Sequence, residues 1–360
     1  NTGAIVTAAE AWEYVAVPEI AFVEPASGQV KTFVVIAGSD LRGGADAIAS
    51  VSLGATAATI VTESDTEVAV VVDHSSDSLN DAVDVTLISS SGSYVVGAGA
   101  WSDLDRGEVG SVSPSAGVAD TRVDIAGQRL LGGGTSLVSV TLAGVEVEWI
   151  GTERDDLVQV HAAPSGALSG TVVITTNTGS VITSETGSTD GFEYLEPGAI
   201  TDVSPSIGQL NTAVTISGTR LLGDGNDLAS ISLAGVEVKS VESVSDTEVT
   251  VIADASEATT GDVLFVTNTG GRVTSVDGWT YGEEPSILTV TPAKGQAGTD
   301  VSIYGVSLRA HGNFVASVTL AGTEAAIDDQ TNLFVNVVAA AAGASSGDVV
   351  LTADSGATVT

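Results

Sequence analysis

The chain has 360 residues, and its 46 Asp and Glu residues against 11 Lys and Arg residues give a formal net charge of −35. It contains no Cys, which excludes disulfides and thiolate metal sites, and the negative charge disfavours binding to nucleic acid or to an anionic membrane surface. No apolar run approaches the roughly 18 residues of a membrane span, so we expect no membrane insertion. Hydrophobic residues still make up 43% of the chain at a mean hydropathy of +0.33, which predicts folded cores.

One pattern occurs four times along the chain. A V-x-P-x-x-G motif opens each copy, and its prolines, Pro25, Pro114, Pro205 and Pro292, are 89, 91 and 87 residues apart. Two further motifs keep the same spacing, an apolar strand ending in Gly (35–38, 124–127, 215–218, 302–305) and an S-V-T-L strand (50–53, 139–142, 230–233, 317–320). Three motifs at one fixed offset predict tandem units of about 90 residues.

Each unit is predicted to consist of strands. The segments 212–218 and 229–238 alternate apolar and polar residues, as half-buried strands do, and runs of Gly, Asp, Ser and Asn separate them. The alanine run Ala339–Ala342 is the best helix candidate, but it aligns with 252–261 and is interpreted as a strand end and turn. Six or seven short strands per unit indicate immunoglobulin-like sandwiches. We therefore expect an all-β, rod-shaped tandem array of four immunoglobulin-like β-sandwiches, stiffened by short Pro-containing linkers.

The motifs resemble the IPT/TIG domain, an immunoglobulin-like fold of plexins and transcription factors. The resemblance rests on S-P-S-x-G, V-x-I-x-G, L-x-G-G-x, S-V-T-L-A-G, S-D-T-E-V, T-G-D-V and a closing W-x-Y, in that order, and it covers nearly the whole chain. The first copy departs from the pattern because Asp103 follows Trp101-Ser102 where Tyr is expected. The resemblance implies a spacer, stalk or adhesive arm, sometimes beside carbohydrate-active domains. The basic loops of the nucleic-acid-binding branch are missing.

The expected domains follow the repeats. They are 1–17, the closing strand of a preceding or neighbouring-chain domain, then four IPT/TIG-like domains at 18–105, 106–196, 197–284 and 285–360, the last without its final strand.

The two ends of the sequence complement each other. Residues 347–360 match 261–274, which continue to Trp279-Thr280-Tyr281, whereas the corresponding Trp-x-Tyr stands at 12–14. Strand addition would complete the fourth domain with the N-terminal strand of another copy and form a head-to-tail homopolymer. Two alternatives stay open: the sequence is a window of a longer array, or the N-terminal strand folds within its own chain or is frayed. For the polymer, the expected interface residues are Ile5, Trp12, Tyr14, Val15, Val349, Leu351 and Val359.

Catalytic and metal sites find little support. His74, His161 and His311 lie at unrelated positions of different repeats, and the G-x-S-x-G string at 343–347 precedes a strand, so it is interpreted as a turn. A weak calcium candidate is the loop with Asp224, Asn226 and Asp227, which the other repeats do not share and which is interpreted as a solvated turn. No cofactor is expected. Trp149 is the one Trp off the repeated position, the kind of outlier that a sugar platform would need.

The sequence thus predicts a non-enzymatic, extracellular structural protein, the subunit of a filament or surface stalk. The absence of Cys and Met suits long exposure outside a cell, and the charge keeps polymers soluble. The sequence has no N-x-S/T site, while its many Ser and Thr leave O-linked glycans open as partners. The alternatives are an adhesin or glycan-binding stalk and an accessory region of a secreted glycanase.

Overall fold

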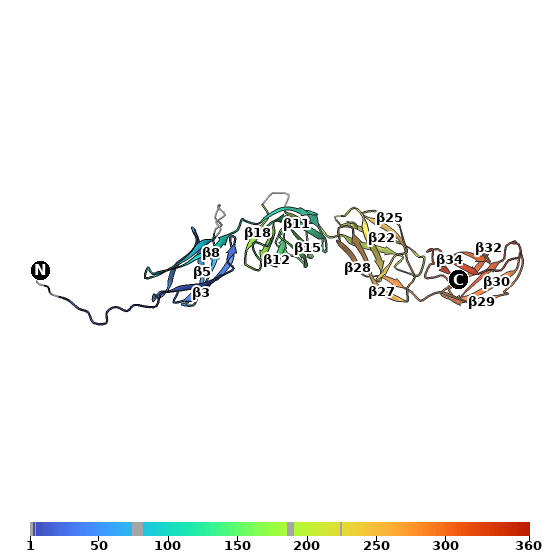
Figure 1. The fold of residues 1–360 in the computed structure, drawn as a ribbon. Helices are drawn as coiled ribbons and strands as arrows, with labels where there is room; N and C mark the ends of the chain where they lie inside the picture. Colours follow the sequence, from blue (N-terminus) through green and yellow to red (C-terminus); the bar gives the residue numbers. More distant parts are fainter. Residues whose placement is uncertain (1–2, 4, 74–81, 186–190, 224) are drawn as a thin grey trace. The chain divides into compact units, whose positions relative to one another are not determined.

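A computed structural model describes residues 3, 5–73, 82–185, 191–223 and 225–360 (Figure 1). Every regular element in this part of the chain is a β-strand, which confirms the all-β prediction. The alanine run Ala339–Ala342 follows the end of a strand and contains no helix, as interpreted from its alignment. The described residues of the N-terminal segment, at the blue end in Figure 1, form no strand before Glu19.

Contacts divide the chain into two compact units. The first comprises Asn1–Ser115, Val123–Ala163 and Leu168–Glu193, and the second comprises Ala116–Arg122, Pro164–Ala167 and Tyr194–Thr360. The finer division into four domains at the boundaries given above stays a prediction.

The first repeat in the first unit forms one sheet that folds over its own core. Its strands are β1 (Glu19–Glu24), β2 (Ser27–Gly28), β3 (Phe33–Ser39), β4 (Ile48–Leu53), β5 (Thr56–Glu63), β6 (Glu67–Val72), β7 (Val83–Ser89) and β8 (Tyr94–Asp103). They are hydrogen-bonded in the order β1-β3-β6-β5-β4-β7-β8-β2. The apolar alternation of β3 places Val34 and Ile36 in the core beside Trp101, all three fully buried.

The second repeat contains two four-stranded sheets, β14-β15-β11-β9 and β13-β12-β17-β18, and β16 pairs with β19. The bounds are β9 (Glu108–Ser113), β10 (Ala116–Gly117), β11 (Arg122–Gln128), β12 (Leu137–Leu142), β13 (Val145–Glu146), β14 (Trp149–Glu153), β15 (Leu157–His161), β16 (Leu168–Gly170), β17 (Val172–Thr176), β18 (Val181–Thr183) and β19 (Phe192–Tyr194).

The second unit repeats this architecture. One repeat has the sheets β20-β22-β26-β25 and β21-β28-β27-β23-β24, and the next has a single sheet, β29-β30-β33-β32-β31-β34-β35. The bounds of the first set are β20 (Ala199–Ser204), β21 (Ile207–Gly208), β22 (Ala213–Thr219), β23 (Leu228–Leu233), β24 (Val236–Glu237), β25 (Ser240–Val244), β26 (Glu248–Ile252), β27 (Thr259–Thr267) and β28 (Arg272–Tyr281). The second set is β29 (Ser286–Thr291), β30 (Asp300–Val306), β31 (Val315–Leu320), β32 (Thr323–Gln330), β33 (Phe334–Val338), β34 (Val349–Ala353) and β35 (Thr358–Val359).

The glycine that ends the apolar-strand motif has a packing role in every repeat. A side chain at Gly127 would overlap the main-chain carbonyl oxygen of Glu108 on β9 and would stand 2.8 Å from Cδ2 of the buried Leu130. The register of β11 against β9 shifts at this glycine, so the bulge brings the neighbouring carbonyl close to its Cα. The same carbonyl approach occurs at Gly38, Gly218 and Gly305.

Candidate assembly interface

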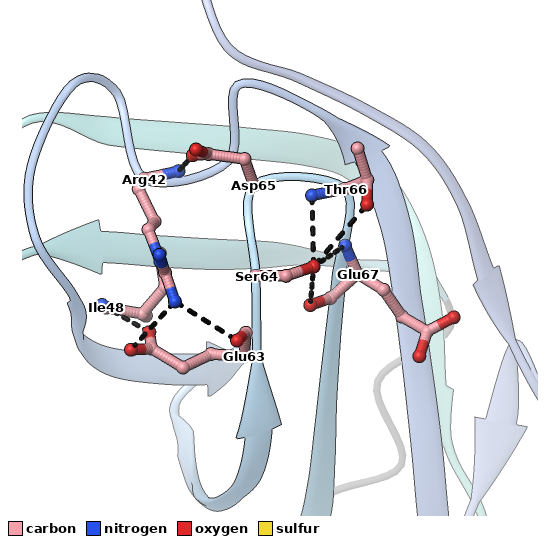
Figure 2. A network of polar contacts seen from close by, with 7 residues as sticks. All are labelled: Arg42, Ile48, Glu63, Ser64, Asp65, Thr66 and Glu67. Atoms are coloured by element: carbon pink, nitrogen blue, oxygen red, sulfur yellow. Dashed lines mark hydrogen bonds and ion pairs between the residues drawn. The ribbon is translucent and has the colours of Figure 1, made fainter.

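The serine hydroxyl of the S-D-T-E motif holds a turn by hydrogen bonds to the backbone. Figure 2 shows the first of these turns, in which the Ser64 hydroxyl oxygen accepts hydrogen bonds from the backbone N–H groups of Thr66 (3.2 Å) and Glu67 (2.9 Å). The same hydroxyl donates to the Glu67 carbonyl at 3.0 Å. Ser245 makes the corresponding bonds in the third repeat. The motif therefore marks a structural turn.

The neighbouring carboxylates fasten a second loop to this turn. Asp65 Oδ1 accepts the Arg42 N–H at 3.2 Å, while Arg42 Nη2 donates to the Glu63 carbonyl at 3.1 Å and lies 3.5 Å from Glu63 Oε1 (Figure 2). Glu63 also accepts the N–H of Ile48. In the other repeats the accepting side-chain oxygen belongs to Asp155, Asp246 or Asn332. Each of these oxygens accepts a hydrogen bond from a loop N–H at 3.0–3.2 Å. These side chains hold loops of the fold.

Two of the three histidines lie among the described residues. His161 lies beside Trp149, His311 Nε2 is 2.9 Å from the Glu283 carbonyl oxygen, and His74 falls outside the described residues. Within the described ranges, no group of three or more His, Asp or Glu residues could hold a metal ion.

The calcium loop is only partly described, because Asp224 lies outside the described residues. The Asn226 side-chain oxygen accepts a bond from Asn268 Nδ2 at 2.8 Å, and Asp227 Oδ1 accepts the N–H of Leu228 at 2.8 Å. Asp354 holds the same loop in the fourth repeat with bonds from Asn313. Burial acts to raise the pKa of Asp354, but the hydrogen bonds from the Asn313 side chain and from backbone N–H groups outweigh it and lower that pKa. Calcium binding stays a prediction.

The closing W-x-Y motif completes the core of the third repeat. Trp279 is fully buried and Tyr281 is 1% exposed, and their rings meet edge to face with centroids 5.6 Å apart at 83°. Asp277, two residues before the Trp, has a positive φ of 50°. Beyond this bend the strand pairs with β27 on one side, and its last two residues pair in parallel with β21 on the other.

The closing strand of the first repeat has Asp103 at the position that Tyr281 occupies in the third repeat. Asp103 occupies the Tyr position, is 7% exposed, and accepts a hydrogen bond from Trp101 Nε1 at 2.9 Å. The residue that departed most from the sequence pattern is therefore a buried partner of the closing Trp. The residue two before the Trp, Gly99, again has a positive φ of 60°.

The N-terminal segment has the local geometry of a closing strand without a sheet. Trp12 and Tyr14 are 77% and 89% exposed, yet their rings are arranged edge to face at 5.8 Å and 81°, nearly as Trp279 and Tyr281 are. Glu10, two residues before the Trp, has a positive φ of 53°. Ile5 and Val15 are also exposed. All four predicted N-terminal interface residues are thus accessible to a partner.

The predicted interface residues of the fourth repeat occupy different environments. Leu351 and Val359 pair with each other across β34 and β35 and are buried in the core, whereas Val349 is half-buried. Among the described residues β35 pairs with β34 at Leu351 and Thr352 only, so β34 keeps an edge at Val349 and Val350. The structure pairs Leu351 with Val359, and their contact with the N-terminal interface residues of another copy stays a prediction.

One part of this site was missed by the sequence. The Pro-x-x-Gly stretch of the fourth repeat, Lys294 and Gly295, is exposed and has no strand, whereas the corresponding β2 and β21 pair in parallel with their closing strands. The signal was present, since the Pro-x-x-Gly and W-x-Y motifs recur together in the chain. Only the structure shows that they are neighbours.

The part of the chain that the structure describes contains no helix with the length and apolarity needed to cross a membrane. Residues 199–281 match the family model of the IPT/TIG domain. These residues form an IPT/TIG domain. The match begins with β20 and ends at Tyr281, the last residue of the closing strand. For residues 199–281 it confirms the resemblance and the immunoglobulin-like fold expected from the motifs. A search of curated proteins gave no match.

The solved structures that align with this chain are distant in sequence. The extracellular region of plexin A4 aligns with a TM-score of 0.43 at 16% identity, covering 95% of this chain and 30% of the plexin chain. SGBP-B of the Bacteroides ovatus mixed-linkage glucan utilization locus, in complex with a mixed-linkage heptasaccharide, aligns with a TM-score of 0.22 at 14% identity over 87% of this chain and 86% of its own. The I9–I11 tandem of titin aligns with a TM-score of 0.24 at 12% identity, covering 72% of this chain and 95% of the titin chain. This chain spans less than a third of the plexin chain.

Proposed function

We propose that this chain is a non-enzymatic, extracellular structural subunit that joins other copies head to tail. Residues 8–14 of one copy form the closing strand of the fourth repeat of the next. The observation that carries this proposal is the exposed Trp12–Tyr14 pair, which has the ring geometry and the preceding bend of the buried Trp279–Tyr281 pair. A segment that already has this ring geometry and bend loses less conformational entropy when it adds to a sheet.

The register of the added strand follows from β27 and β28. There Gly261 pairs with Trp279 and Val263 with Ser275, so the aligned residues predict Gly347 opposite Trp12 and Val349 opposite Ala8 of the next copy. The backbone edge of β34 at Val349, which β35 does not pair with, is the position that the added strand occupies in this register.

A second row of bonds extends the pairing to the Pro-x-x-Gly stretch. In the third repeat Thr280 N–H donates to Ser206 O at 3.0 Å, and Gly282 N–H donates to Gly208 O at 3.1 Å. The equivalent donors in the added strand are Glu13 and Val15, and the acceptors are the carbonyls of Ala293 and Gly295. Each aromatic ring that becomes buried contributes about 4–6 kcal/mol before the costs of association.

The segment after the strand already lies as a linker between repeats does. The Val15 side chain sits over Gly44 in the first repeat, as Leu104 sits over Gly133 in the second. Both glycines have a positive φ, of 75° and 83°. The strand is therefore presented from the surface of its own first repeat, in the direction that a closing strand leaves a preceding one.

Sedimentation velocity and electron microscopy at several concentrations test the proposal. We expect the full chain to form polymers that lengthen with concentration. The variant with Trp12→Ala and Tyr14→Ala should need at least about 100-fold more protein to assemble, because hot-spot truncations cost 2 kcal/mol or more each. Trp149→Ala, which removes another exposed Trp, is the matched control and should assemble normally. Discrete single chains at every concentration, or polymers from a chain deleted of residues 1–17, would overturn the proposal.

A glycan-binding stalk is the second candidate, because one exposed aromatic surface favours it. Trp149 is 55% exposed on β14, an edge strand, and packs edge to face on His161 with centroids 5.0 Å apart at 63°. The ring of Trp149 lies over Gly151, where a side chain would displace it. An exposed, supported indole is suited to stacking on a sugar ring. Affinity electrophoresis in soluble glucans tests this: Trp149→Ala should abolish retardation and Trp12→Ala should not, and migration of the unaltered chain at its normal rate would refute it.

A further inference from the structure

A main-chain hydrogen bond between consecutive repeats recurs in both units. In the first unit Phe33 N–H, at the start of β3, donates at 2.7 Å to the carbonyl of Thr178, in the turn between β17 and β18. In the second unit Ala213 N–H, at the start of β22, donates at 2.8 Å to the carbonyl of Ser355, in the turn between β34 and β35. In each case the residue after the acceptor is a glycine with a positive φ, of 84° or 87°. One repeat thus docks a hairpin turn on the preceding repeat.

The first repeat has the same hairpin turn, and it is exposed. Ser89 N–H donates to Ser93 O at 2.8 Å and Gly92 N–H donates to Ser89 O at 3.0 Å, which are the bonds that close the two docked turns. Gly92 also has a positive φ of 87°. Ser91 and Gly92 are exposed, whereas the corresponding residues of the docked turns are half-buried. We name residues 91–93 the free turn.

The fourth repeat has the complementary surface, and it too is exposed. We name residues 296–300 the free edge. Gln296 N–H donates to Thr299 Oγ1 at 3.0 Å, as Gln29 N–H donates to Thr32 Oγ1 at 3.0 Å in the docked first repeat. Gln29 and Thr32 are 1% and 0% exposed, whereas Gln296 is exposed and Thr299 is half-buried. The free edge therefore has the shape of a docked edge without its cover.

The spacing along the chain lets one copy supply both the closing strand and the turn. The distance from the last position of the closing motif to the acceptor in the next turn is similar in all cases: 75 residues from Asp103 to Thr178, 74 from Tyr281 to Ser355, and 77 from Tyr14 to Ser91. A copy whose N-terminal strand enters the fourth repeat of another copy therefore brings its free turn to the free edge of that repeat.

We propose that the free turn of one copy docks on the free edge of the next, with Asp300 N–H donating to the Ser91 carbonyl. The partner is a second copy of this chain, and the inference rests on the strand addition of the proposed function. It adds a second contact that fixes the rotation of one copy about the added strand, because a strand and a turn together leave no free pivot.

Cysteine cross-linking tests the contact directly, since the chain has no Cys of its own. A backbone hydrogen bond brings the two Cα atoms to about 5–6 Å, within reach of a disulfide. Ser91→Cys chains mixed with Asp300→Cys chains should form linked dimers at least about tenfold faster than Ser91→Cys mixed with Ser243→Cys, an exposed position on β25, because docking raises the effective concentration.

A pair of glycine variants gives a second, independent test. A Cβ at Gly92 meets no atom within 4 Å, but at the docked glycines it would lie 3.3 Å from Lys31 O and 3.0 Å from Asn211 O. Gly92→Ala should therefore crowd the free edge of the next copy and raise the concentration needed for assembly about tenfold. Gly144→Ala is the matched control, because Gly144 has a φ of 82° and open space around it. It should show equal backbone strain and normal assembly.

The outcomes separate the two proposals. Polymers that need Trp12 and Tyr14 but show neither the 91–300 cross-link nor the Gly92→Ala effect would leave strand addition standing and overturn the docked turn. Single chains at all concentrations, without cross-links, would overturn both. A cross-link that forms equally well in the Trp12→Ala and Tyr14→Ala variant would support the turn contact and overturn its dependence on strand addition.

Discussion

The close approach of a carbonyl to Gly127 makes a sharp prediction about stability. In Gly127→Ala the new methyl group must displace the Glu108 carbonyl or the Leu130 side chain, and such overpacking costs about 1–3 kcal/mol. A single repeat of roughly 90 residues has a total free energy of unfolding of about 5–13 kcal/mol. The variant should therefore still fold, with a midpoint lowered by about 4–8 °C for each kcal/mol lost.

The matched control is Gly166→Ala in the same repeat. Gly166 has nothing within 4 Å of a built Cβ and no positive φ, so its substitution should be neutral or stabilising by up to about 1 kcal/mol. Calorimetry of the full chain gives the midpoints, and hydrogen exchange followed on peptides from 106–196 assigns the weakened repeat. Equal midpoints and equal exchange for the two variants would refute the packing argument.

Three further predictions concern polar groups. Asp103→Ala should cost about 1–3 kcal/mol because it leaves the buried Trp101 N–H unpaired, whereas Asp103→Asn keeps an acceptor and should cost less; thermal unfolding followed by fluorescence checks both. Burial, and then the nearby Asp254 charge, raise the pKa of Tyr281 to about 12. The neutral Tyr281 therefore contributes its full stabilisation below pH 10, and this contribution is lost between pH 10 and 12. The corresponding loss of stability should be absent from the alkaline unfolding curve of Tyr281→Phe. The lowered pKa of Asp354 gives a contribution present above its ordinary value of 3.8 and lost as pH falls through the folded value, so Asp354→Asn should flatten the acid limb of the stability curve.

Much of the fold was predictable because the strands alternate cleanly and three motifs recur in all four repeats. The alternation placed Val34 and Ile36 in the core, and alignment between repeats prevented the alanine run Ala339–Ala342 from being taken as a helix. The sequence also predicts a closing strand at the N-terminus, because Trp12 and Tyr14 stand in the spacing of Trp279 and Tyr281, and this assignment stays a prediction.

The remaining parts of the site depend on contacts that a sequence does not encode in residue type. The partner of Trp101 was missed because Asp in a Tyr position signals a departure from the pattern and says nothing of a buried hydrogen bond. The docking of one repeat's hairpin turn on the preceding repeat was missed because the bond between them joins main-chain atoms. Leu351 was expected at the interface, but its face of the strand was not separable by sequence from that of its neighbours, and it lies in the core.

The bond between consecutive repeats has a consequence for how such a chain changes over evolutionary time. Its donors stand in residues as different as Phe33 and Ala213, and its acceptors in Thr178 and Ser355, since only the peptide groups take part. A duplicated or deleted repeat would meet the same pair of peptide groups at its new border. Gene length can then vary in steps of one repeat while this main-chain contact is kept at each border.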